Sequence, residues 1–221
     1  MKKQILLLFL LYSIVAFSQK KEMVDNFWKG NYDKTIEIGK QILQSEPNDF
    51  ETILLIARAE DEKGNFKNAI PYLESAKKMM SEDWQKSWAF IELAKNSFGT
   101  GKLDDAKLFY NEALKVKGTK NSEKELKKFG MLTGLDEYYK NWKIRETQNI
   151  IFHFENSINE NEIERITKTR QIAFEQINVF FNSKLPKKID FFVWNLNESY
   201  NQILNTNLGF SNPVFCISHN R

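Results

Sequence analysis

A short segment that begins with glycine recurs three times in the first half of the chain, at Gly30, Gly64 and Gly101. The first two glycines are 34 residues apart and the next two are 37 apart. In each copy an aromatic residue or a leucine follows two positions after the glycine, and a small residue follows five positions after it. A nearly constant spacing close to 34 residues is typical of tandem helix pairs that stack on one another. The sequence therefore predicts three such pairs, each with a tight turn at its glycine, which can adopt a left-handed backbone without steric cost.

Apolar residues around the second and third glycines recur at steps of three and four, as on one face of a helix. In these two units they resemble the pattern of the tetratricopeptide repeat over residues 20–118, with a weaker first unit in which Gly39 and Ile42 depart from it. That family implies a right-handed superhelix whose inner groove holds a peptide or a partner protein, and it implies no catalysis. The matching residues are Ile53, Ile56, Ala57, Gly64, Phe66, Ala69, Leu73, Ala76, Phe90, Leu93, Ala94, Gly101, Leu103, Ala106, Phe109 and Ala113.

Binding by such a scaffold is expected on the inner face of the first helix of each pair. Helical spacing assigns to this face one aromatic anchor, several apolar residues and charges of both signs, which suits an extended or helical peptide. The alternative is that Trp88 and Phe98 pack against a neighbouring helix or the capping helix. The predicted groove residues are Glu51, Leu54, Arg58, Asp61, Trp88, Ile91, Lys95 and Phe98.

The amino terminus has the pattern of a secretory signal. Lys2 and Lys3 precede an apolar run over residues 5–17, and Ala16 and Ser18 are small residues at the positions that a signal peptidase recognises. We predict cleavage after Ser18, export to the periplasm or beyond, and no stable membrane anchor afterwards. A retained anchor is the alternative, but the run is shorter than the roughly 20 residues that span a bilayer.

Charge and cysteine content exclude some partners and some sources of stability. The chain has 32 Lys and Arg against 29 Asp and Glu, and removal of residues 1–18 takes away two lysines, which leaves 30 against 29. Basic and acidic residues alternate along the predicted helix faces, so no nucleic-acid partner is expected. Cys216 is the only cysteine, so no internal disulfide can form.

The second half of the chain follows a different pattern. Residues 122–140 are predicted to form a helix that caps the repeats, within a capping and linker segment over 121–145. Strand patterns then appear at 150–154 and 189–194, and the second is apolar enough to be covered on both faces. A long helix is predicted at 160–181, a brief one at 197–204, and a third strand at 214–218. Residues 146–221 thus describe part of an α/β domain of the order βαβαβ.

This region resembles the amino-terminal half of the catalytic domain of gluzincin-type zinc metallopeptidases. The segments Ile150–Phe154, Lys188–Trp194 and Gly209–Pro213 carry the resemblance, but the His-Glu-x-x-His helix of that family is absent. Zinc would be implied only if a missing carboxy-terminal half exists. The two histidines do not form a ligand pair: His153 is expected to be structural and His219 to lie at a frayed end. No catalytic residue, metal site or cofactor is therefore assigned.

The expected fold is mainly α: a solenoid of about three helix pairs over residues 19–120, a capping helix, and a small incomplete α/β region. The preferred function is an exported scaffold that binds a protein or peptide and is not an enzyme as written. The alternative is the amino-terminal part of a secreted zinc metallopeptidase that lacks its catalytic helix.

Overall fold

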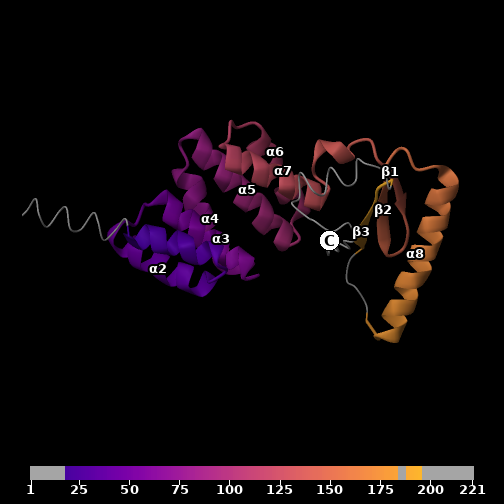
Figure 1. The fold of residues 1–221 in the computed structure, drawn as a ribbon, viewed down its shortest axis with the longest axis horizontal. Helices are drawn as coiled ribbons and strands as arrows, with labels where there is room; N and C mark the ends of the chain where they lie inside the picture. Colours follow the sequence, from indigo (N-terminus) through magenta and orange to yellow (C-terminus); the bar gives the residue numbers. More distant parts are fainter. Residues whose placement is uncertain (1–17, 184–187, 196–221) are drawn as a thin grey trace, which may run out of the picture. The chain divides into compact units, whose positions relative to one another are not determined.

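The computed structural model of the chain describes residues 18–183 and 188–195. The protein is mainly helical, with one small three-stranded mixed sheet (Figure 1). It forms two compact units, Met1–Glu123 and Lys124–Arg221. The predicted signal segment up to residue 17, the helix at 197–204, the strand at 214–218, Cys216 and His219 lie outside the described residues. No helix within the described part of the chain is both long enough and apolar enough to cross a membrane.

The first unit consists of consecutive helices joined by short turns. Three of these turns contain Gly30, Gly64 and Gly101, whose φ angles are 77°, 76° and 74°, so the predicted left-handed turns are confirmed. Each turn joins two helices, and α3 contacts both its partner α4 and the next helix α5. The helices are residues 18–28, α2 (Tyr32–Ser45), α3 (Phe50–Glu62), α4 (Phe66–Met79), α5 (Asp83–Gly99) and α6 (Leu103–Leu114).

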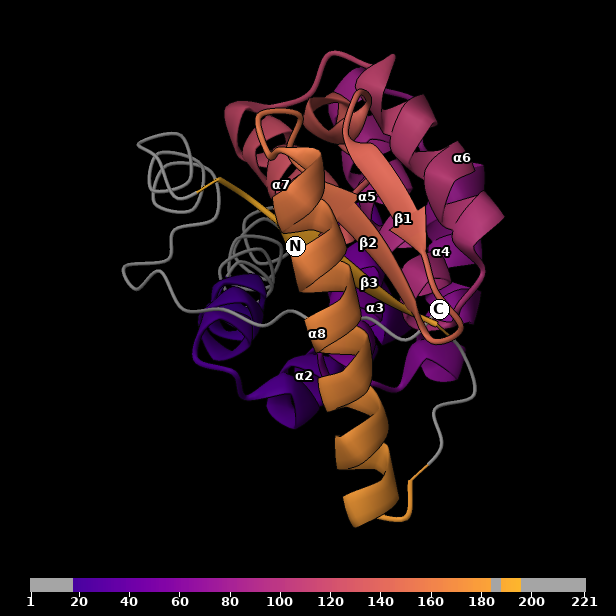
Figure 2. The same cartoon turned by 90° about the vertical axis from the view of Figure 1, so that its right-hand side faces the viewer.

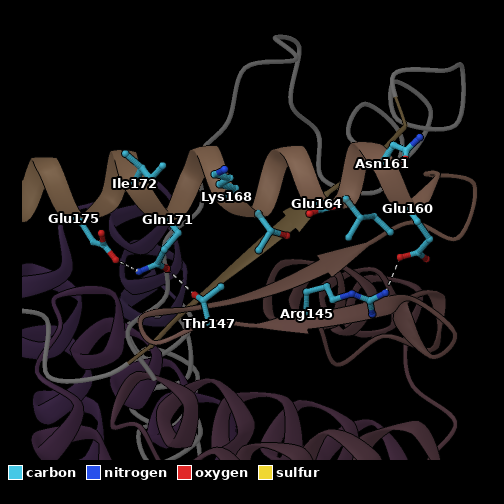
Figure 3. A pocket seen from close by; sticks show the side chains of 11 residues that line it. Arg145, Thr147, Glu160, Asn161, Glu164, Lys168, Gln171, Ile172 and Glu175 are labelled. Carbon is cyan, nitrogen blue, oxygen red and sulfur yellow. Dashed lines mark hydrogen bonds and ion pairs between the residues drawn. The ribbon is translucent and has the colours of Figure 1, made fainter.

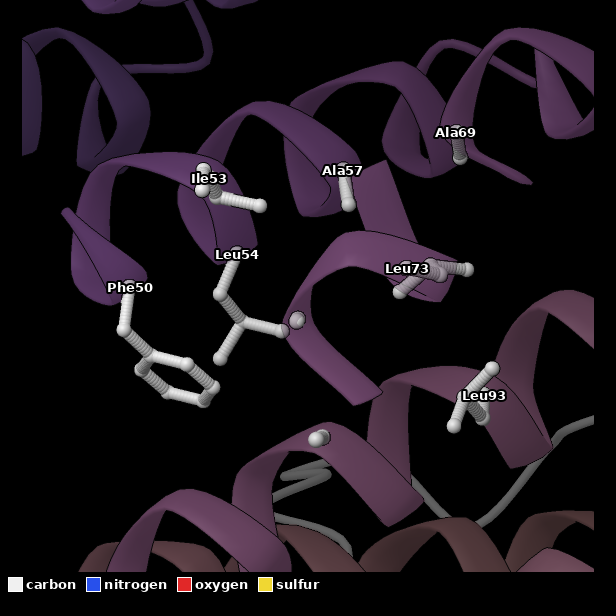
Figure 4. Close-up of a cluster of buried hydrophobic side chains, with 9 residues drawn as sticks. Phe50, Ile53, Leu54, Ala57, Ala69, Leu73 and Leu93 are labelled. Carbon is white, nitrogen blue, oxygen red and sulfur yellow. The ribbon is translucent and has the colours of Figure 1, made fainter. Parts of the chain in front are cut away.

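Small residues are part of the buried core between these helices. Ala57 of α3 and Ala69 and Ala76 of α4 are fully buried, and larger apolar side chains surround them (Figure 4). An alanine leaves room for the backbone of the facing helix, so the larger residues can interdigitate on either side of the contact. The predicted apolar faces of α3, α4 and α5 are confirmed as one shared core.

The first pair departs from this pattern at Gly39 of α2, and the structure gives the reason. A Cβ atom at this position would lie 2.7 Å from Cγ1 of Ile56 and 2.7 Å from Cε of Met23. Both of these side chains are buried, in α3 and in the helix over residues 18–28. Glycine at position 39 therefore permits three helices to meet at one point, and Ile42 fills the core one turn later.

We expect the Gly39→Ala variant to lose about 1–3 kcal/mol of the free energy of unfolding, because the added methyl overpacks a filled core. The matched control is Gly64→Ala, where φ is 76° but no atom lies within 4 Å of the new Cβ. The control should lose only about 1 kcal/mol, from the cost of a left-handed backbone at a residue with a side chain. Urea unfolding followed by circular dichroism measures both. Equal losses would contradict the crowding around Gly39.

Helix α7 (Lys120–Thr133) is shorter than the predicted helix over 122–140. Gly134 follows it with a φ of 74°, which ends the helix, so the prediction was wrong beyond Thr133. The chain then forms a 3₁₀ turn, η1 (Glu137–Tyr139), in which the carboxylate of Asp136 accepts a hydrogen bond from the backbone N–H of Tyr138 at 2.9 Å. The capping role of this helix stays a prediction.

The sheet of the second unit has the order β1-β2-β3. Strand β1 (Lys143–Glu146) pairs antiparallel with β2 (Ile150–Phe154), and β2 pairs parallel with β3 (Ile189–Val193). Helix α8 (Glu160–Phe180) connects the two parallel strands. The predicted strand, helix and strand are confirmed, but β1 was missed because its four residues carry three charges and three of the four lie within the segment over 121–145 that was assigned to the cap and linker.

Each face of the sheet packs against a different cluster of side chains. Ile150, Phe152 and Phe154 point toward α8 and pack with Ile163, which confirms the alternation predicted for β2. On the opposite face, Phe192 of β3 packs against aromatic residues of the segment that follows α7. Strand β3 is therefore covered on both faces, as predicted. This second cluster contains Met131, Tyr138, Tyr139, Trp142, Phe192 and Trp194.

Helix α8 is long relative to the strands that it covers, and its last turns extend past them (Figure 2). The predicted apolar stripe is buried only in its first part. Ile163 is buried, whereas Ile177 is 56% exposed and Phe180 is 81% exposed. The apolar stripe therefore runs along the whole of α8 in the sequence, but only its first part is buried.

Candidate functional site

The guanidinium group of Arg58 is the centre of a cluster of charged and aromatic side chains in the first unit. Arg58 lies on α3, and its Cζ atom is 4.9 Å from the ring centroid of Phe27 and 4.8 Å from that of Trp88. Phe27 belongs to the helix over residues 18–28 and Trp88 belongs to α5, which are the first helices of the pairs before and after the pair that contains α3. The cation of Arg58 therefore lies between aromatic residues of these two helices. A contact between a cation and an aromatic ring stabilises the fold more when the cation is shielded from water.

Arg58 also forms an ion pair with a buried carboxylate. Its Nε atom lies 2.9 Å from Oε1 of Glu92, a residue of α5 whose side chain is fully buried. Lys95 is one turn further along α5, and its Nζ atom lies 3.4 Å from Oε2 of Glu92 and 3.8 Å from Oε1 of Glu62. Two cations therefore neutralise Glu92, which is what allows a carboxylate to remain charged in the interior.

Asp61 of α3 is the carboxylate with the most strongly shifted pKa in this cluster. Its Oδ1 atom accepts a hydrogen bond of 2.7 Å from Nδ2 of Asn96, and the same amide nitrogen donates to the carbonyl of Phe66 at 2.9 Å. Burial raises the pKa of Asp61 from 3.8 to about 7, and the nearby charge of Glu92 adds to the increase. The Asp61 carboxyl thus changes its charge close to neutral pH.

The structure brings only part of the predicted groove together. Arg58, Asp61, Trp88 and Lys95 are half-buried and lie within this cluster, and Phe98 is half-buried near the end of α5. Glu51 is exposed on the first turn of α3. Leu54 and Ile91 are buried, so both contribute to the core and neither lies on an open surface. Trp88 packs against Arg58 of the neighbouring helix, which is the alternative considered for it.

Phe27, Glu92 and Asn96 belong to the cluster but were missed. The position equivalent to Arg58 in the next unit is Lys95, 37 residues later, so the contacts of Arg58 with Glu92 and of Asp61 with Asn96 join non-equivalent positions, and a comparison of the repeats does not point to them. Phe27 lies in the weak first unit, where the repeat pattern gives little guidance.

His153 has a structural environment in the second unit. Its Nε2 atom lies 2.7 Å from Oδ1 of Asp190, and its ring stacks on Phe192 with centroids 4.4 Å apart. Within residues 18–183 and 188–195, no three His, Cys, Asp or Glu side chains are grouped so that they could hold a metal ion.

The cluster around Arg58 can position side chains for the recognition of a partner. Its cations are paired with carboxylates and stacked on rings, an arrangement that fixes the positions of exposed side chains nearby on α3 and α5. Compared with models of known protein families and with curated proteins, the chain matches none.

Proposed function

We propose that the chain is an exported repeat scaffold of the tetratricopeptide type, which binds another protein or a peptide through the inner face of α3 and α5 and performs no catalysis. Residues 1–18 would direct export and be removed by cleavage after Ser18, and the product would be periplasmic or secreted. The proposal needs no cofactor.

One observation carries this proposal: two residues one turn apart on α3 contact two residues one turn apart on α5, in the same order along both helices. Arg58 pairs with Glu92, and Asp61 with Asn96, at separations of 34 and 35 residues. Contacts in this order support a parallel arrangement of α3 and α5. In solenoid proteins such alignment produces a continuous surface that binds extended partners.

The accessible part of this surface is the part that a partner would contact. Glu51 is exposed, and the half-buried side chains of Trp88, Lys95 and Phe98 follow along α5. An aromatic side chain held in place by a neighbouring cation loses little conformational freedom when a partner binds, and rigid aromatic residues dominate many interfaces.

Placing a photo-crosslinking residue at position 51 should capture a partner, whereas the same residue at position 74 should not. Glu51 and Glu74 are both exposed glutamates, on α3 and α4 respectively, so they are matched in chemistry and differ in face. Crosslinking in cells that express the gene, followed by affinity measurements with Glu51→Lys and Glu74→Lys, tests the assignment. A partner that is captured equally from both positions, or that binds both variants equally, would exclude the inner face.

A second function is supported by one observation in the second unit. The parallel β2-α8-β3 arrangement is the order expected from the resemblance to zinc metallopeptidases. Under this proposal the chain is the amino-terminal part of such an enzyme. A sequence that encodes His-Glu-x-x-His downstream of the codon for Arg221 would favour it over the scaffold.

A further inference from the structure

The outer edge of β1 carries backbone groups that point away from the sheet. Within the described residues β1 pairs only with β2. The N–H of Thr147 donates to the carbonyl of Ile150 at 2.9 Å. Hydrogen-bonded pairs alternate along an antiparallel ladder, so Arg145 is bonded to β2 and the backbone groups of Ile144 and Glu146 point outward. The carbonyl of Ile144 indeed accepts a hydrogen bond from Nη1 of Arg145 at 3.0 Å, a contact from outside the ladder.

A groove of about 690 Å³ runs between this strand and α8 (Figure 3). Arg145 and Thr147 form one wall, and they reach across to Glu160 at 2.7 Å and to Gln171 at 2.6 Å. The other wall is the side of α8 that bears Glu164, Lys168 and Ile172. The volume falls within the usual range for ligand sites, roughly 300–1,000 Å³. An extended segment laid beside β1 would therefore have a helix along one of its faces.

Two aliphatic side chains lie exposed on either side of the position that such a segment would take. Ile172 lines the groove and is 45% exposed. Ile144 is 56% exposed and points to the opposite face of the sheet, because Arg145 and its neighbours alternate in direction. Successive side chains of an added strand would cover first one and then the other.

A second copy of β1 is a poor occupant of this edge, because its charges would oppose their own kind. Antiparallel pairing through the outward groups requires Ile144 or Glu146 of one copy to face Ile144 or Glu146 of the other. The possible registers place Arg145 opposite Arg145, Arg145 opposite Lys143, or Glu146 opposite Glu146 of the second copy. Like charges directly opposite one another destabilise a strand pair. The edge thus favours a different sequence over self-association.

We propose that the β1 edge binds an extended peptide segment of a partner protein as an additional strand, with α8 as the second wall of the site. The segment carries aliphatic side chains at alternate positions and has no lysine or arginine opposite Arg145. Main-chain hydrogen bonds to Ile144 and Glu146 supply the affinity, and contacts with Ile144 and Ile172 supply the specificity. This site is independent of the inner face of α3 and α5.

The test is selection of binders from a display library of random short peptides on the whole chain. We expect the selected peptides to show alternating aliphatic residues and to bind the Ile144→Pro variant about tenfold or more weakly, because proline removes the outward N–H. Proline at this position leaves the β1–β2 hydrogen bonds intact, since Ile144 does not take part in them. The matched control, Ile144→Thr, keeps the N–H and should retain most of the affinity.

A second arm leaves the protein unchanged. A selected peptide that is N-methylated at the amide facing the Ile144 carbonyl should bind the natural chain about tenfold more weakly than its unmethylated form, because one main-chain hydrogen bond is lost. Failure to select any binder, equal affinity for Ile144→Pro and Ile144→Thr, or indifference to N-methylation would each overturn the proposal. A dimer that is lost in Ile144→Pro would instead assign the edge to a second copy and would also overturn it.

Discussion

The Arg58→Glu variant should lose the cooperative unfolding transition of the first unit. The new carboxylate would lie against Glu92, whose side chain is fully buried and 2.9 Å from the present guanidinium group. It would also replace a cation between the rings of Phe27 and Trp88. Removal of one partner from a buried pair costs roughly 3–5 kcal/mol, and a repulsive replacement costs more. Because a domain is stable by only about 5–15 kcal/mol, this loss is comparable to the whole.

Thermal unfolding followed by circular dichroism measures this effect. Lys67→Glu is the control, because it reverses an exposed charge on α4 and should change the stability by about 0.5 kcal/mol or less. The double variant Arg58→Met with Glu92→Leu should be more stable than Arg58→Met alone, since no unpaired carboxylate remains in the interior. A variant Arg58→Glu that melts like the natural chain would show that Glu92 is solvated. Because Arg58→Glu is expected to unfold the first unit, a loss of partner binding in this variant would not identify Arg58 as a binding residue.

The first unit should become less stable as the pH rises from about 4 to about 7, and Asp61→Asn should remove this dependence. The folded state holds a proton on Asp61 up to a pKa of about 7, whereas the unfolded chain releases it near 3.8. Between these values the folded state binds more protons, so each unit of pH lowers the free energy of unfolding, by about 1.4 kcal/mol at most. The total is on the order of 4 kcal/mol.

Asparagine keeps the acceptor for Asn96 and carries no charge, so Asp61→Asn should match the natural chain below about pH 3.5, and its advantage in stability should grow by about 2–3 kcal/mol between pH 5 and pH 8. Urea unfolding at both pH values measures the difference. Glu92, Lys95 and Glu62 are the other charged groups near Asp61, and Glu62→Gln serves as the control because Glu62 is exposed. If the stability of Asp61→Asn and of the natural chain changed in parallel with pH, the proton would reside elsewhere.

The turns of the first unit could be predicted because each depends on the backbone conformation of a single residue. A residue with φ near 75° is strongly favoured to be glycine, and Gly30, Gly64 and Gly101 mark such positions in the sequence. Gly134 has the same conformation, but it lies outside the repeated spacing, so the helix before it was extended too far. Strand β1 was missed for a related reason, because four residues with three charges show no alternation that a pattern could detect.

The candidate site could be predicted only in part, because helical spacing assigns a residue to a face of one helix but not to the neighbours of that face. Leu54 and Ile91 have the right spacing for an inner face, yet both are buried. Glutamate is a residue type usually found on the surface, and the burial of Glu92 depends on its ion pair with Arg58 of another helix pair. Contacts between units of a repeat therefore decide which side chains remain available to a partner.

Strands β2 and β3 are synthesised at different times, so their pairing has to wait until β3 has been made. Ile150 pairs with Ile189, so β2 leaves the ribosome well before the strand that completes its ladder, with the whole of α8 made in between. The helix pairs upstream depend on contacts close in sequence and form quickly, whereas non-local strand pairs form slowly. Nascent chains that pause within α8 would carry a folded first unit and an apolar strand β2 that is paired with β1 on one edge only, the kind of intermediate that chaperones bind.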